Sequence, residues 1–159
     1  MPWTEPAEWE IGDVITEERL NEEIRDNLLV LKSMPHVEYL GPTLFKSTIS
    51  ASFVNIDATA LNLELTVEWD DAIVEIGLVA SGGWTGSSGT MFTDVEVDGT
   101  RIGEATHGLS GTNASGYYGN LGFTAIVTGL SQGLHTFNAQ FRCGSGNIGV
   151  RQFWVRQVG

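Results

Sequence analysis

The chain has 159 residues, of which 42% are hydrophobic, and its formal net charge at pH 7 is −12. This length fits one medium-sized domain with an appendage, whose core needs no disulfide or metal to hold it together. The charge argues against nucleic acid as a partner, because phosphates would be repelled by most of the surface. No apolar run reaches the roughly 20 residues that cross a bilayer, so we expect no membrane insertion.

Residues 1–13 are expected to form an irregular arm, since Pro2 and Pro6 interrupt them. The arm carries Trp3 and Trp9, and tryptophan is enriched among residues that dominate interface energetics. Two interpretations follow: the arm docks on a partner, or it folds back on its own domain.

The sequence then predicts an amphipathic helix from Ile15 to Met34. Thr16 is a good N-cap, two glutamates follow where the helix dipole favours negative charge, and Pro35 ends the helix. One face carries apolar residues at helical spacing, namely Leu20, Ile24, Leu28 and Leu31. That face must pack on the rest of the chain, on sister copies or on another protein. A seam that includes Asn27 would match a coiled coil.

From about residue 44 the apolar period changes to two, which is typical of strands. Strands are expected at Leu44–Phe53, Leu61–Trp69, Ala72–Ala80, Met91–Val97, Thr100–Gly103, Leu121–Thr128, His135–Cys143 and Ile148–Val158. Asp98-Gly99 predicts a two-residue hairpin turn. The fold class is therefore mainly β: residues 1–40 form an N-terminal arm and a single α-helix, and residues 41–159 form an antiparallel β-sandwich of the jelly-roll type with about seven or eight strands.

Two Gly/Ser-rich segments interrupt these strands and read as loops, Ser81–Gly89 with Trp84 and His107–Gly119 with Tyr117 and Tyr118. Exposed aromatics on loops can stack on sugars or hold a partner. The alternative is that these rings fold down and close the ends of the sandwich.

Charge is divided unevenly along the chain. Residues 1–104 hold all 20 acidic side chains against five basic ones, whereas residues 105–159 hold no acidic residue and three arginines. This division favours contact between copies, although solubility alone would also explain the acidic excess.

Catalytic patterns are weak throughout the sequence. The three histidines lie far apart in no zinc-ligand spacing, and His135 shares the inward parity of a predicted strand. Asp70-Asp71 reads as a turn between strands, and Cys143 reads as a small core residue. We therefore expect no catalytic residues and no cofactor.

One acidic group resembles the start of a calcium loop. Asp94, Glu96 and Asp98 have the required spacing, but Ala105 stands where the closing acid is needed. The alternation with Val95 and Val97 is explained equally well by a strand with an acidic outer face, so no metal is expected.

Two stretches carry a resemblance to a known family. The first comprises Trp9, Gly12 to Thr16, Leu20-Asn21, Ile24 to Leu28 and Leu31-Lys32. It resembles the N-terminal signature of small tailed-bacteriophage structural proteins, in which a tryptophan and a G-D/E-x-(V/I)-T step precede a helix carrying L-N-x-x-(I/V)-R-D-N. The second comprises Val127 to Leu130, Gly133, His135 to Phe137 and Gln140 to Arg142, and looks like the closing hairpin of the β domains in such proteins.

The resemblance implies a component of the virion: a head decoration, a fibre or a tail accessory, often trimeric, with a jelly roll like those of the tumour-necrosis-factor and complement-C1q type. The sequence thus predicts a non-enzymatic capsid decoration (cement) or short head-fibre protein, assembled in the bacterial host cytoplasm. It is expected to pack as a homotrimer and to bind the major capsid protein or another virion protein. The expected attachment and oligomerisation residues are Trp3, Trp9, Leu20, Ile24, Arg25, Asn27, Leu28 and Leu31. The alternative is a carbohydrate-binding or host-adhesion module on the phage tail, in which Trp84, Tyr117 and Tyr118 contact a host-surface glycan.

Overall fold

The computed structural model describes residues 16–20, 24, 34–84, 89–113 and 119–159. The chain divides into two compact units, Met1–Pro35 and His36–Gly159. In the first unit, α1 spans Glu17–Leu20 and begins with two glutamates in its first turn, where the helix dipole stabilises them. The remainder of the predicted helix lies outside the described residues, apart from Ile24, whose side chain is 52% exposed. No helix in the described part is both long and apolar enough to span a bilayer.

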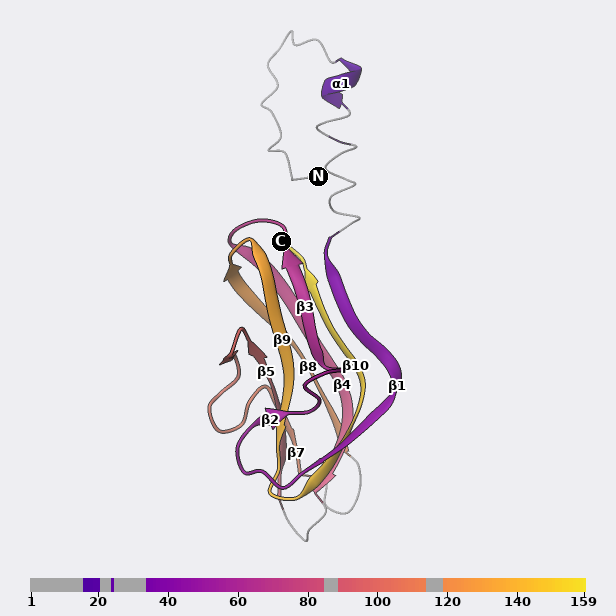
Figure 1. The fold of residues 1–159 in the computed structure, drawn as a ribbon, viewed down its shortest axis with the longest axis vertical. Coiled ribbons are helices and arrows are strands. Elements are labelled where there is room, and N and C mark those ends of the chain that lie inside the picture. The colour runs from indigo at the N-terminus through magenta and orange to yellow at the C-terminus, as the bar shows by residue number, and fades with distance from the viewer. Residues whose placement is uncertain (1–15, 21–23, 25–33, 85–88, 114–118) are drawn as a thin grey trace. The chain divides into compact units, whose positions relative to one another are not determined.

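The second unit is built from antiparallel strands (Figure 1). Its described residues form ten strands: β1 His36–Thr48, β2 Val54–Asn55, β3 Asn62–Val67, β4 Ala72–Trp84, β5 Met91–Val97, β6 Thr100–Arg101, β7 Ser110–Thr112, β8 Gly119–Leu130, β9 Gly133–Arg142 and β10 Gly146–Gln157.

The strand pairing defines a jelly roll. One sheet has the order β1-β10-β4-β8; the other has the order β2-β9-β5-β6, with β3 also on β9 and β7 also on β5. If β2 and β3 are counted as one strand, and β6 and β7 as another, the chain has eight strands in sequence order. The first then pairs with the eighth (β1 with β10), the second with the seventh (β2 and β3 with β9), the third with the sixth (β4 with β8) and the fourth with the fifth (β5 with β6 and β7). This nested pairing of a folded ribbon is the jelly-roll arrangement. Figure 1 shows β1 in purple beside β10 in yellow, so both ends of this unit lie together.

Both sheets turn one face toward a shared core, as period-two alternation requires. The predicted alternation after residue 60 is confirmed, because Leu61, Leu65 and Val67 are buried. The largest fully buried side chains are Phe137 and Phe141 of β9 and Phe153 of β10. His135 and Cys143 are also buried on the inward side, as their parity predicted.

The predicted first strand differs from the structure at both ends. β1 begins at His36 and pairs with β10 from that residue on, so the predicted boundary between residues 40 and 41 falls inside β1. Gly41 and Pro42 sit at a register shift between Leu40 and Leu44. An edge strand can carry proline at such an irregularity, since no ladder hydrogen bond is needed there.

β4 also continues further than predicted. The segment that read as a loop from Ser81 pairs with β10 as far as Trp84. Packing favours glycine at position 82, because a Cβ there would lie 2.5 Å from Met91 Sδ and 2.8 Å from Leu121 Cδ1. Glycine here marks close approach of a core side chain, not a loop.

Both predicted turns are confirmed. Asp98 and Gly99 have φ values of 49° and 82° and connect β5 to β6, as a two-residue hairpin requires. Asp71, between β3 and β4, has a φ of 57°.

The Asp98 turn is tied to β9 through His135. His135 Nδ1 lies 2.6 Å from Asp98 Oδ2, and His135 Nε2 lies 2.8 Å from the Ser131 carbonyl oxygen. Burial opposes a charge on the imidazole, but the bonds to Asp98 and Ser131 outweigh it and raise the pKa of His135. Burial of Asp98 is likewise outweighed by bonds from the Thr136 amide and from His135, which lower the pKa of Asp98.

This pair should make stability depend on pH. Because the pKa of His135 is raised in the folded state, its contribution is complete below the unfolded value of about 6.5 and is lost as the pH rises through the folded pKa. The lowered pKa of Asp98 gives a second loss as the pH falls below about 3.9. We expect the urea midpoint to fall between pH 6 and pH 9 in the natural chain and to fall less in His135→Gln. The matched control is His107→Gln, and an equal fall in all three proteins would contradict this assignment.

Candidate functional site

The outer face of the β2-β9-β5-β6 sheet gathers charged and aromatic side chains. In β5 the odd positions enter the core, so Phe92, Asp94 and Glu96 point outward, opposite Arg142, Gln140 and Asn138 of β9. Asp94 is nevertheless completely buried. The segment that begins at Arg101, the last residue of β6, covers it through the contacts described next.

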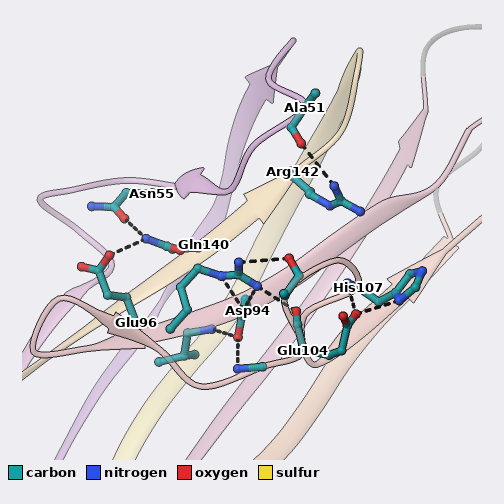
Figure 2. Close-up of polar contacts among 12 residues, drawn as sticks. Ala51, Asn55, Asp94, Glu96, Glu104, His107, Gln140 and Arg142 are labelled. Carbon is teal, nitrogen blue, oxygen red and sulfur yellow. Dashed lines mark hydrogen bonds and ion pairs between the residues drawn. The ribbon is translucent and has the colours of Figure 1, made fainter.

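Asp94 holds that segment against the sheet (Figure 2). Arg101 donates to Asp94 Oδ2 from Nε at 2.7 Å, and it donates from Nη2 as well. Asp94 Oδ1 accepts the backbone N–H groups of Val95 at 2.8 Å and Gly103 at 2.9 Å. Arg101 also donates to the carbonyl of Glu104 at 2.9 Å. A buried carboxylate with this many donors fixes the position of the whole segment.

A second arginine lies on the same face without an acidic partner among the described residues. The guanidinium carbon of Arg142 is 4.8 Å from the centre of the Phe92 ring and 5.4 Å from that of Phe53. Its Nη1 donates to the Ala51 carbonyl at 3.2 Å, whereas its Nε is buried with no hydrogen-bond partner. Arg101 stacks on the same Phe53 ring at 3.7 Å.

Two hollows adjoin Phe92. The larger, about 530 Å³, is lined by Thr90, Phe92, His107, Gly108, Leu109, Ser110, Gly111 and Asn113. The smaller, about 370 Å³, is lined by Ala51, Gly89, Thr90, Phe92, Arg142, Cys143 and Gly144. Thr90 and Phe92 line both, so they form the wall between the hollows.

His107 marks the rim of the larger hollow. Its ring meets the Phe92 ring edge to face, with the centres 5.1 Å apart. Glu104 accepts the His107 backbone N–H at 2.6 Å and lies 2.8 Å from Nδ1. Backbone N–H groups of Thr106 and His107, followed by the imidazole itself, lower the pKa of Glu104. An exposed acid–histidine pair therefore lies at this rim.

Cys143, the single cysteine of the chain, lines the smaller hollow. It is buried, and that burial raises the pKa of the thiol. Since the thiolate is the nucleophile, Cys143 is poorly suited to attack a substrate at neutral pH.

The three acids that resembled a calcium loop do not converge. Asp94 binds Arg101, Glu96 binds Gln140 at 2.9 Å, and Asp98 binds His135. No group of three metal-ligating side chains is found within the described ranges. Each of the three acids therefore has its own hydrogen-bond partner.

Most of the predicted contact residues fall outside the described part of the chain. This applies to Trp3, Trp9, Arg25, Asn27, Leu28, Leu31, Tyr117 and Tyr118, and to the side chains of Leu20 and Trp84. Their roles remain predictions. The sequence analysis did not identify Phe53, Phe92, Arg101 and Arg142 as site residues. One signal was available, because Phe92 lies at an outward position of its strand, where an isolated aromatic side chain suggests contact with a ligand or a partner.

The β1-β10-β4-β8 sheet presents a different outer surface, which we name the apolar face. It is the outward side of that sheet and carries the exposed side chains of Leu40 (70%), Phe45 (62%), Ile73 (37%), Val79 (41%) and Ile126 (55%). Trp154 lies across Gly77 in the middle of this face, where a Cβ would be 1.8 Å from the indole. The outward side of β4 is therefore partly exposed at Ile73 and Val79.

No protein-family model and no curated protein matches the sequence. Similar solved structures include Eiger TNF from S. frugiperda, with 6% identity, 79% of this chain and 93% of that chain covered, and a TM-score of 0.43. They also include a family 35 carbohydrate-binding module from Paenibacillus barcinonensis, with 14% identity, 76% and 96% covered, and a TM-score of 0.36. A family 35 module from Clostridium thermocellum gives 14% identity, 76% and 90% covered, and a TM-score of 0.35. The jelly-roll assignment rests on the strand pairing described above.

The Asp94–Arg101 pair should be the main polar support of the site. Arg101→Met leaves a buried carboxylate without its counter-charge, and we expect a loss of about 2–4 kcal/mol in unfolding free energy, measured by denaturant titration. Adding Asp94→Asn should recover most of that loss, because no uncompensated charge remains. The control is Arg156→Met, whose exposed pair with Glu75 should contribute no more than about 1 kcal/mol. Equal small losses for both arginines would show that Asp94 is not the anchor.

Proposed function

We propose that the chain is a non-catalytic jelly-roll component of a bacteriophage particle, a capsid decoration or short head fibre, that packs as a homotrimer through the apolar face. The phage assignment rests on the sequence resemblance at residues 9–32. The observation that carries the oligomeric part is the set of exposed Leu, Phe, Val and Ile side chains on one sheet, since large apolar patches mark interaction sites.

The charge of the sheet supports contact between copies. Lys46 pairs with Asp57 at 2.7 Å; the other charged residues of the four strands are two basic ones, Arg151 and Arg156, and two acidic ones, Glu38 and Glu75, in a chain of net charge −12. Arg156 and Glu75 already pair at 3.0 Å. Copies of a strongly acidic protein can therefore meet at this sheet without the repulsion that other surfaces would cause.

The layout of the face favours a ring. Leu40 and Phe45 lie on the edge strand β1, and Ile126 lies on the opposite edge strand β8. Two different apolar edges suit a heterologous contact, in which one edge meets the other, and such contacts close into rings when the rotation permits. The number of copies in the ring, three, is taken from the resemblance to phage structural proteins.

A charge on the apolar face should break the assembly. Ile126→Glu places a carboxylate on a surface that copies would bury, so we expect the trimer mass to fall to that of a single 17.2 kDa chain in light scattering at micromolar concentration. Leu134→Glu is the matched control, because Leu134 is 61% exposed on the other sheet. A natural chain that is already monomeric, or equal effects of both variants, would overturn the proposed interface.

Attachment is assigned to the first unit, Met1–Pro35, with Trp3 and Trp9 as anchors. A chain reduced to residues 36–159 should keep its β circular-dichroism spectrum and its oligomeric state, because the jelly roll lies wholly within that unit. It should fail to co-sediment with particles that the full chain decorates. Retained co-sedimentation would place attachment on the jelly roll, and loss of the β spectrum would show that the first unit belongs to the core.

The alternative function is a carbohydrate-binding or host-adhesion module, in which Trp84, Tyr117 and Tyr118 were predicted to contact the glycan. Their side chains lie outside the described part of the chain. The described structure supports a different location for such binding, the hollows beside Phe92.

A further inference from the structure

We propose that the two hollows beside Phe92 form one binding site for an acidic saccharide, with Arg142 pairing with the carboxylate of a uronic-acid unit. This site lies on the sheet opposite the apolar face, so it goes beyond the proposed assembly function and does not depend on it.

The first support is the uncompensated charge of Arg142. The neighbouring Arg101 is neutralised by the buried Asp94, whereas the Arg142 guanidinium has one carbonyl acceptor, two aromatic rings and no acidic partner among the described residues. A guanidinium presents a planar set of donors that matches a carboxylate. Arg142 also lines the smaller hollow, so a ligand that enters it meets this charge.

The second support is that Arg142 is held in place before any ligand arrives. Phe53 and Phe92 both lie within cation–π distance of its guanidinium, and the Ala51 carbonyl accepts from Nη1. An arginine that is already ordered loses little side-chain entropy on binding, which favours affinity.

The third support is the chemistry of the walls. The hollows of about 530 and 370 Å³ fall in the range of small-ligand sites, roughly 300–1,000 Å³. Thr90, Ser110 and Asn113 supply hydroxyl and amide groups for sugar hydroxyls, and the Thr90 and Asn113 side chains are hydrogen-bonded to each other. Phe92, between the hollows, offers an apolar surface to the C–H groups of a pyranose. This combination of a ring, short polar groups and one cation suits an acidic sugar better than an extended apolar ligand.

The test compares an oligogalacturonate with its methyl ester, titrated into the full chain by calorimetry. The two probes differ only at the carboxyl group, which is charged in the acid and neutral and methylated in the ester, so the comparison needs no variant. We expect the acid to bind at least roughly tenfold more tightly than the ester, which is the scale of a charged hydrogen bond. Equal affinity, or no binding of the acid at millimolar concentration, would overturn the proposal.

Variants then locate the site. Arg142→Gln should reduce the affinity for the acid to that for the ester, and Arg142→Lys should keep part of the preference. Arg151→Gln is the control, because Arg151 is an exposed arginine of β10 on the other sheet and its loss should change nothing. A preference for the acid that survives Arg142→Gln, or that is lost equally in Arg151→Gln, would mean that general charge and not this site binds the sugar. Oligomeric mass, measured in parallel, separates failure here from failure of the assembly proposal.

Discussion

The structure depends on one constraint: the first strand of a folded ribbon must pair with the last, so that two sheets share a single core. β1 pairs with β10 along most of its length, and this pairing closes the jelly roll around Phe137, Phe141 and Phe153. Once the inward positions are assigned to the core, every alternate residue must face outward. Function in this domain is therefore decided by what the outward positions carry.

The two sheets use those outward positions differently. The β1-β10-β4-β8 sheet exposes aliphatic and aromatic side chains with nearly balanced charge, whereas the β2-β9-β5-β6 sheet carries the Asp94–Arg101 anchor, Arg142 and the two hollows. The first composition suits burial against copies, and the second suits a polar ligand. One fold can thus separate assembly from recognition on opposite sides of a core.

The sequence predicted those parts of the fold that depend on local pattern. Alternation located β3, β5, β8 and β9, and Asp98-Gly99 located a turn whose φ values match. Errors came where packing over long sequence distances overrides local preference. Gly82 read as loop but pairs with Ile148 of β10 and makes room for Met91. β1 begins at His36 and not at the predicted Leu44, because pairing with β10 extends it past the irregularity at Pro42, which an edge strand tolerates.

The candidate site was harder to predict, because its parts meet only after folding. Arg142 and Phe53 come together from β9 and the β1–β2 connection, and sequence alone gives no sign that Arg101 neutralises Asp94 while Arg142 stays unpaired by any described acid. The most direct test of the two-sided account is hydroxyl-radical footprinting of the full chain at rising concentration. The account predicts that Leu40, Phe45 and Ile126 become protected as copies assemble while Leu134 and Phe92 keep their reactivity. Reactivity of the apolar face that stays equal to that of Leu134 at every concentration would contradict it.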